Sequence, residues 1–187
     1  MHGISAAFLY KEHRMETIRL ILPSMEYDEE IMSLRAELLA AQDKDDFAGC
    51  SGLDDFDSTE GWLNHLEAMR RGLTPSVPSD CYLAVREKDH RVVGVIDLRH
   101  HIDHPILGSW GGHMGYTVRP SERGRGYAKQ MLHLNLENCR ALGLERVLIT
   151  CSRDNPASEH TIVANGGVFE KEISVGSGFV RRYWIKL

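Results

Sequence analysis

Residues 116–128 constrain the fold of this chain more than any other segment. The first three are typical of a β-strand, and Pro120 ends that strand because proline lacks the backbone N–H that a strand ladder needs. A short loop with Gly124 and Gly126 then enters a long amphipathic helix. A strand, a glycine-containing loop and a helix in this order are typical of an α/β protein.

This loop has the properties of a phosphate-binding site. Backbone N–H groups at the start of a helix lack partners within the helix, and the helix dipole favours a negative charge there. The two glycines let a ligand approach the backbone, while Arg123 and Arg125 add positive charge. The segment has neither the GK[ST] of a Walker loop nor the third glycine of a dinucleotide fingerprint. We therefore expect it to bind a diphosphate.

The rest of the chain alternates between strand-like and helix-like patterns of apolar residues. We expect strands at 17–22, 81–86, 91–99, 113–118, 146–151, 168–175 and 179–185, and helices at 28–41, 58–72, 126–142 and 156–165. Residues 42–60 and 100–112 are expected to be loops. This order predicts a mixed α/β fold, with a single central, mostly antiparallel, twisted sheet flanked by helices.

Composition indicates one ordinary soluble domain. The 187 residues are 42% hydrophobic and 26% charged, and we expect residues 15–187 to form the domain and 1–14 to be an N-terminal extension. No apolar run approaches the roughly 18 residues of a membrane span, and the four cysteines include no CxxC, which favours reduced thiols in the cytoplasm. The HHxDH run at 100–104 could hold a metal, but a solvated loop is favoured, so no metal is expected.

Charge is distributed unevenly along the chain. Residues 16–67 carry a net charge of −11, whereas residues 68–187 carry +5. Either the acidic helix faces are simply solvated, or the early half borders a cationic ligand and the later half holds an anionic one. The basic residues do not alternate with aromatic residues in one stripe, so no nucleic acid partner is expected.

Several motifs together resemble one known family. Arg123-x-x-Gly126-x-Ala128, preceded by Val-Arg-Pro, resembles the acetyl-CoA loop of the GNAT superfamily of N-acetyltransferases. Asn155-x-x-Ser158, followed by Asn-Gly-Gly, resembles its next strand–helix unit, and the order of elements is similar over roughly residues 16–187. The runs GHMGYTVRP, NPAS and RYWI are similar to a bacterial subgroup described as predicted acetyltransferases. The resemblance implies a GNAT-like fold and acetyl transfer from acetyl-CoA to a primary amine.

The resemblance also implies which residues bind acetyl-CoA. The backbone of residues 116–118 would pair with the pantetheine arm as an added strand does. The loop amides would bind the pyrophosphate, and the Asn155 region would reach the pantetheine or diphosphate from the following helix. The implied set is Thr117, Val118, Arg123, Gly124, Arg125, Gly126, Tyr127, Ala128, Asn155 and Ser158.

The candidate catalytic residues are less clearly defined, because one position departs from the family pattern. The superfamily often has a tyrosine seven residues after the asparagine, as the acid that protonates the leaving thiolate, and this chain has Ile162 there. A base is useful because an alkyl ammonium, with a pKa of about 10.4, is mostly protonated at neutral pH. His113 and Tyr116 are the polar candidates on the strand, although His113 can instead be structural. Tyr183 is a weaker candidate for the acid.

We expect direct transfer in a ternary complex, because no cysteine lies in the loop or beside His113 to form an acyl-enzyme. The expected partner is a small, cationic amine acceptor, and a homodimer is compatible with the sequence. Two alternatives stay open. One is a CoA-binding regulatory module that has lost turnover, which the Ile162 departure supports, and the other is a nucleotide-diphosphate binder that only resembles the family.

Overall fold

A computed structural model of the protein describes residues 16–42 and 47–187. The strands are β1 (Ile18–Ile21), β2 (Ser79–Arg86), β3 (Val92–Arg99), β4 (Tyr116–Val118), β5 (Arg146–Ser152), β6 (Val168–Val175) and β7 (Gly178–Lys186). The helices are α1 (Asp28–Ala41), α2 (Thr59–Arg70), α3 (Tyr127–Ala141) and α4 (Pro156–Ala164). Every expected strand and helix is present, so the α/β class is confirmed. The expected extension, 1–14, lies outside the described residues.

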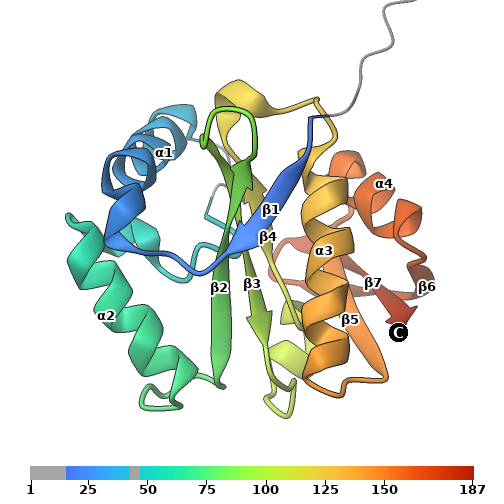
Figure 1. The fold of residues 1–187 in the computed structure, drawn as a ribbon. Coiled ribbons are helices and arrows are strands. Elements are labelled where there is room, and N and C mark those ends of the chain that lie inside the picture. The colour runs from blue at the N-terminus through green and yellow to red at the C-terminus, as the bar shows by residue number, and fades with distance from the viewer. Residues whose placement is uncertain (1–15, 43–46) are drawn as a thin grey trace, which may run out of the picture.

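The strands form two antiparallel sheets, of order β1-β2-β3-β4 and β5-β7-β6. The prediction of one continuous sheet therefore needs a correction, because the ladder is interrupted between β4 and β5. Strand β4 is also shorter than the expected 113–118, since its ladder with β3 begins at Tyr116, although the carbonyls of His113 and Gly115 still accept hydrogen bonds from β3. The two sheets stand side by side, with β4 and β5 at their adjoining edges (Figure 1).

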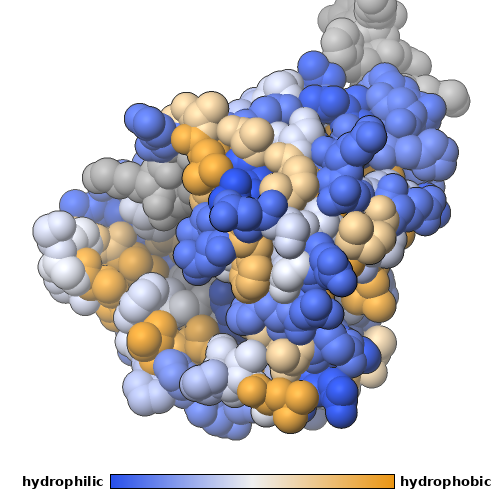
Figure 2. Space-filling view, turned by 90° about the vertical axis from the view of Figure 1, so that its left-hand side faces the viewer, coloured by the Kyte–Doolittle hydropathy of each residue, from blue (hydrophilic) through white to orange (hydrophobic). Residues whose placement is uncertain are grey.

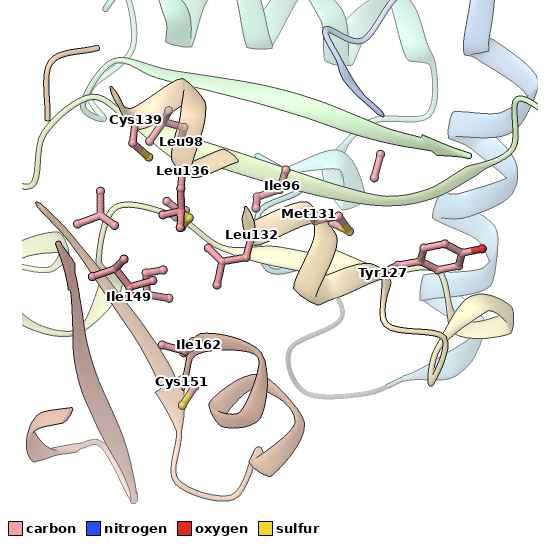
Figure 3. Close-up of a cluster of buried hydrophobic side chains, with 14 of the residues drawn as sticks. Ile96, Leu98, Tyr127, Met131, Leu132, Leu136, Cys139, Ile149, Cys151 and Ile162 are labelled. Atoms are coloured by element: carbon pink, nitrogen blue, oxygen red, sulfur yellow. The ribbon is translucent and has the colours of Figure 1, made fainter. Parts of the chain in front are cut away.

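Helices cover both faces of the larger sheet. Figure 1 shows α1 and α2 on one side of it and α3 on the other, with α4 beside α3. This double cover explains why every residue of β3 from Val92 to Leu98 is buried, instead of every second one. The stretch is apolar except for Asp97. The apolar side of α3 packs between the sheets, and its buried residues include Met131, Leu132 and Leu136 (Figure 3).

Local sequence sets the start of the shorter helices. The Asn155 side chain accepts a hydrogen bond from the Ser158 N–H at 3.0 Å, and Pro156 occupies the first position of α4, as the sequence predicted. At α2, the Ser58 hydroxyl accepts from the Gly61 N–H at 3.2 Å. Such a cap contributes about 1 kcal/mol.

No helix in the described residues is long and apolar enough to cross a membrane.

Candidate functional site

The two sheets are joined next to one end of β4. His113, three residues before β4, donates its backbone N–H to the carbonyl of Leu148 in β5 at 2.8 Å. The Leu148 N–H in turn donates to Nδ1 of the His113 ring at 2.9 Å. The histidine therefore takes the place of a strand residue between the sheets, and the ladder ends there.

Beyond this junction, β4 has one edge directed away from its own sheet. The Gly115 carbonyl and the Arg119 N–H bond to β3 at 3.1 and 2.8 Å, and Thr117 lies opposite a β3 residue in the ladder. Alternate residues of a strand direct their peptide groups to opposite sides. The peptide groups of Tyr116 and Val118 therefore point away from β3, towards the side where β5 lies.

The loop after β4 presents its backbone outwards. Gly124 and Gly126 have positive φ angles of +76° and +81°, which glycine adopts without strain. No atom of residues 16–42 and 47–187, apart from its chain neighbours, lies within 4 Å of the place where a Cβ on Gly124 would stand. Gly126 precedes α3, whose first turn, with Ala128 in it, has neither a side-chain cap nor an acidic residue. An anion fits such a helix start.

The arginines of the loop lie at the surface. The Arg125 side chain is 54% exposed and pairs with Glu122 at 3.1 Å. Arg123 is also exposed, and its Nε donates to the Val118 carbonyl at 3.2 Å. Positive charge therefore stands on both sides of Gly124, so the residues present fit the diphosphate of a CoA molecule.

Tyr127 differs from its neighbours because its side chain points inwards. It is 1% exposed, and its hydroxyl donates to Oε2 of Glu16 at 2.5 Å and accepts from Nη1 of Arg86 at 3.1 Å. The side chain of Tyr127 is therefore not available to a ligand, so the expected role in binding can belong only to its backbone amide.

Tyr116, Asn155 and Ser158 are brought together from β4 and α4. The Tyr116 hydroxyl lies 2.8 Å from Oγ of Ser158, whose N–H is bound by Asn155. Burial raises the pKa of Tyr116 to about 12, although the hydrogen bond with Ser158 opposes the shift. The phenol is therefore protonated at neutral pH and can donate a hydrogen bond, but it cannot serve as a base.

The environment of His113 favours the structural alternative. The residue is 5% exposed, and burial lowers the pKa of its imidazole to about 4. In the neutral ring Nδ1 accepts from Leu148, so the proton resides on Nε2. No lone pair is left to take a proton from a substrate amine, so the geometry does not favour His113 as the base.

Ile162 and Tyr183, the two positions considered for the acid, both face the core. Ile162 is fully buried in the cluster between the sheets (Figure 3). Tyr183 in β7 is 2% exposed, and its hydroxyl donates to Glu159 at 2.6 Å. Burial and that carboxylate raise the pKa of Tyr183 to about 12. Within the described residues the Tyr116 hydroxyl is bonded to Ser158, not to Tyr183, and isoleucine has no group that could donate a proton.

The histidine run at 100–104 is used in local contacts. His100 lies 2.9 Å from Asp80, and the rings of His101 and His104 each accept a backbone N–H two residues further on. Across residues 16–42 and 47–187, no three histidine, cysteine or acidic side chains are grouped to hold a metal.

Part of the acidic first third of the chain is neutralised within the fold, which neither sequence interpretation anticipated. Glu30 and Glu37 of α1 pair with Arg119 at 3.1 and 2.8 Å. Their spacing of seven residues places them on one face of a helix. That spacing was the only sign in the sequence that both could pair with the same arginine. The side of the molecule formed by α1 and α2 is mainly hydrophilic, with small separate apolar areas (Figure 2).

Other acidic residues of this segment stay exposed. Asp54 and Asp55 form a short 3-10 turn, and Asp57, 99% exposed, pairs with Arg35 at 3.1 Å. Three more, Asp43, Asp45 and Asp46, lie outside the described residues. The expected acidic border of an acceptor site therefore rests on residues 54–57.

The comparison with protein families agrees with this geometry. Residues 19–168 match the family model described as an acetyltransferase (GNAT) domain. The chain therefore belongs to the GNAT acetyltransferase family, which confirms the resemblance and the class of enzyme, an acetyl-CoA-dependent N-acetyltransferase. The sequence comparison with curated proteins gave no match.

Solved structures share the fold at low sequence identity. A ribosomal L7/L12 alpha-N-protein acetyltransferase, RimL, in complex with coenzyme A superposes with a TM-score of 0.65 and 18% identity, covering 91% of this chain and 94% of RimL. The microcin C7 self-immunity acetyltransferase MccE, in complex with acetyl-CoA and AMP, gives 0.63 and 16%, covering 91% and 92%. The putative acetyltransferase yncA from Salmonella typhimurium, with acetyl-CoA, gives 0.62 and 14%, covering 92% and 94%. These likenesses confirm the fold.

Proposed function

We propose that this chain moves the acetyl group of acetyl-CoA directly to a primary amine while both substrates are bound. One observation carries the proposal. The outward edge of β4 is followed by a short loop with the exposed Arg123 and Arg125, and this loop leads into a helix start that lacks a side-chain cap. That arrangement suits an extended arm that ends in a diphosphate.

The binding roles follow from this geometry. The peptide groups of Tyr116 and Val118 would bond to the pantetheine arm, and the amides from Arg123 to Ala128 would bind the diphosphate. Ser158 contacts the Tyr116 hydroxyl from α4, and Asn155 caps the same helix, so both would border the arm. When bound, acetyl-CoA supplies the thioester, and the chain supplies the orientation.

Tyr116 is the proposed catalytic group for the leaving sulfur. Its pKa of about 12 lies above the roughly 8.5 of an alkyl thiol, so complete transfer of its proton to a thiolate would be uphill. A hydrogen bond from the phenol can still stabilise the negative charge that develops on sulfur as the C–S bond breaks and the C–N bond forms. Ser158 holds the hydroxyl in place.

The acceptor amine would enter in its neutral form, and the cationic nitrogen formed by its attack would lose one proton to water. Because His113 has no free lone pair, kcat/KM should rise between pH 7 and 9 with the fraction of unprotonated amine. We propose a small cationic acceptor, because Asp54, Asp55 and Asp57 are exposed on the segment between α1 and α2. The cysteines are buried and form no disulfide within the described residues, which supports a cytoplasmic location, and a homodimer stays a prediction.

The deciding experiment measures free CoA thiol released from acetyl-CoA with a panel of amines: a polyamine, an aminoglycoside, an amino acid and a peptide with a free N-terminus. Mass spectrometry should show the acetylated amine. Binding of CoA without release of thiol on any amine would favour the regulatory module. Preferential binding of nucleotides that lack pantetheine would favour the diphosphate binder.

Tyr116→Phe tests the catalytic assignment. We expect kcat to fall about tenfold or more, with KM for acetyl-CoA within about twofold, because the hydroxyl acts mainly on the developing charge. Tyr183→Phe removes a buried hydroxyl of similar pKa that donates to Glu159 and should keep kcat close to normal. Equal kcat values in the two variants would contradict the assignment.

A further inference from the structure

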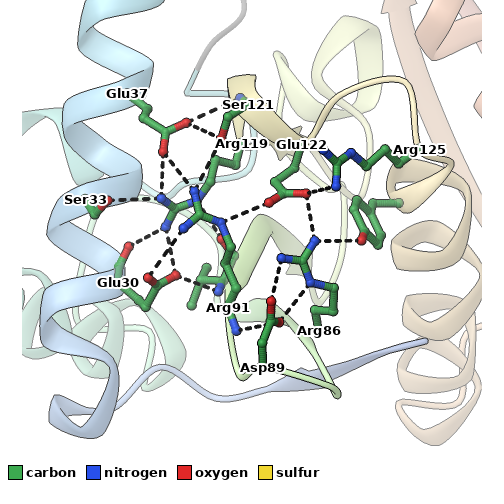
Figure 4. A network of polar contacts seen from close by, with 12 residues as sticks. Glu30, Ser33, Glu37, Arg86, Asp89, Arg91, Arg119, Ser121, Glu122 and Arg125 are labelled. Carbon is green, nitrogen blue, oxygen red and sulfur yellow. Dashed lines mark hydrogen bonds and ion pairs between the residues drawn. The ribbon is translucent and has the colours of Figure 1, made fainter. Parts of the chain in front are cut away.

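A dense network of ion pairs lies beneath the loop that precedes α3 (Figure 4). It joins that loop to α1 and to the turn between β2 and β3, although these segments are far apart in sequence. Its members are Glu30, Ser33, Glu37, Arg86, Asp89, Arg91, Arg119, Ser121, Glu122, Arg125 and Tyr127. We call this set the loop anchor.

Arg119 attaches the beginning of the loop to α1. Its side chain is 0% exposed, and its donors reach the Val92 carbonyl, the Ser33 hydroxyl, the Glu37 carboxylate, and both the carbonyl and the carboxylate of Glu30, at 2.7 to 3.1 Å. These contacts use all five N–H donors of the guanidinium. The arginine is therefore committed to the fold and is not available to a ligand.

Glu122 is the centre of the other half of the anchor. Its side chain is 7% exposed, with Oε2 at 2.8 Å from Arg86 and 3.1 Å from Arg125, and Oε1 at 2.9 Å from Arg91. Arg86 also donates to the hydroxyl of Tyr127, the first residue of α3. One carboxylate thus holds an exposed arginine of the loop and, through Arg86, the start of the helix.

The negative charge of Glu122 has the wrong sign for attracting a diphosphate. A carboxylate beneath a loop that binds a diphosphate repels the ligand, so on electrostatic grounds alone Glu122 weakens binding. Three arginines compensate its charge, and the exposed residues of the loop, Arg123 to Gly126, lie between the inward-facing Glu122 and Tyr127. The network therefore fixes both ends of the exposed segment from below.

We propose that Glu122 is a positioning residue for acetyl-CoA, which holds Arg125 and the start of α3 so that the loop amides converge before the ligand arrives. This inference rests on the proposed function, because it requires the loop to bind CoA. A preorganised loop loses less conformational entropy on binding, which offsets the repulsion of the buried carboxylate.

The test is the dissociation constant of CoA measured by titration calorimetry for the wild type, Glu122→Gln and Tyr127→Phe. Removing a negative charge would by itself tighten the binding of an anion, whereas loss of positioning weakens it. We expect Glu122→Gln to raise the dissociation constant about tenfold at 0.15 M salt and to keep most of that difference at 0.5 M salt, where charge effects are screened. Tyr127→Phe, which changes no charge, should raise it about threefold.

Glu170→Gln is the matched control. It removes a carboxylate from another largely buried arginine, since Glu170 accepts from Arg182 at 2.6 Å, but it lies in the second sheet. CoA binding should stay within about twofold of the wild type. Circular dichroism establishes that each variant is folded, and if Glu122→Gln does not fold, Tyr127→Phe decides.

Unchanged or tighter CoA binding in folded Glu122→Gln, or in Tyr127→Phe where that variant decides, overturns the inference and leaves the proposed function intact. Failure of the wild type to bind CoA overturns both. The inference is also overturned if Glu122→Gln and Glu170→Gln lose the same affinity for CoA. Equal losses would show that removing any such carboxylate weakens binding by destabilising the fold.

Discussion

The two ends of β4 contrast in how closely they are enclosed. Before β4, His113 bonds to β5, and Gly49 of the α1–α2 segment rests against Gly115. After β4, the loop through Gly124 faces open space. Gly49 and Gly124 have the same φ of +76°. A Cβ on Gly49 would stand 2.1 Å from the Gly115 carbonyl oxygen, whereas one on Gly124 would meet no atom of the described residues within 4 Å.

The same backbone conformation therefore serves two purposes. At the enclosed end a glycine permits close packing, and at the open end it leaves the backbone accessible, as the proposed binding of CoA requires. The contrast teaches that positive φ alone does not identify a binding loop, because the surroundings decide its use. Each prediction below would break this contrast or make it sharper.

The largest effect is expected for Gly49→Ala. The left-handed φ costs about 1 kcal/mol for alanine, and overlap with the backbone of Gly115 adds up to about 3 kcal/mol. Urea unfolding should show a loss of about 4 kcal/mol. Gly124→Ala has the same φ without overlap and should lose only about 1 kcal/mol. Equal losses would break the contrast.

The next effect concerns His113 and pH. Burial lowers its pKa to about 4 from 6.5, so the unfolded chain binds a proton more readily than the folded one as the pH falls through 6.5. Folding stability should therefore decline between pH 6.5 and 4, by about 3 kcal/mol from this residue. Urea unfolding of His113→Asn, which keeps an acceptor for Leu148, should show a decline smaller by that amount. If the stability of His113→Asn fell with pH as much as that of the wild type, the assignment of this decline to His113 would be contradicted.

At the open end, Gly126→Val should weaken CoA binding at least tenfold, or about 1.4 kcal/mol, because a branched side chain would cover the first amides of α3. Calorimetry with CoA gives the measurement. Gly143→Val is the control, since Gly143 has a similar φ of +78° just past the other end of α3, with no atom near its Cβ position. Both variants place a valine at a left-handed φ and so have the same backbone strain. Only Gly126→Val should therefore lose affinity for CoA.

The smallest effect is expected on the acceptor side. Changing Asp54, Asp55 and Asp57 together to Asn should raise KM for a cationic amine about threefold at low salt and leave KM for acetyl-CoA nearly unchanged, because exposed charges act through a screened field. Steady-state kinetics at two salt concentrations provides the check. An anionic best substrate would refute the proposed acceptor class.

Much of the fold follows from local sequence. The bounds of α1 agree with the apolar spacing of residues 28–41, and the cap at Asn155 and Pro156 fixes the start of α4. The backbone geometry of the loop before α3 was also predictable, since Gly124 and Gly126 determine it over a few residues. These features depend on contacts between near neighbours, so the chain alone carries the information.

Only the tertiary structure decided which side chains reach the site. Arg119 and Glu122 look like ordinary loop charges in the sequence, but their partners lie as many as 89 residues away, for Arg119 and Glu30, and 36 residues away, for Glu122 and Arg86. The split between the sheets and the structural bonds of His113 depend on Leu148, 35 residues further on. A residue's burial and partners are set by the packing of distant segments, and the order of residues specifies that packing only through the whole fold.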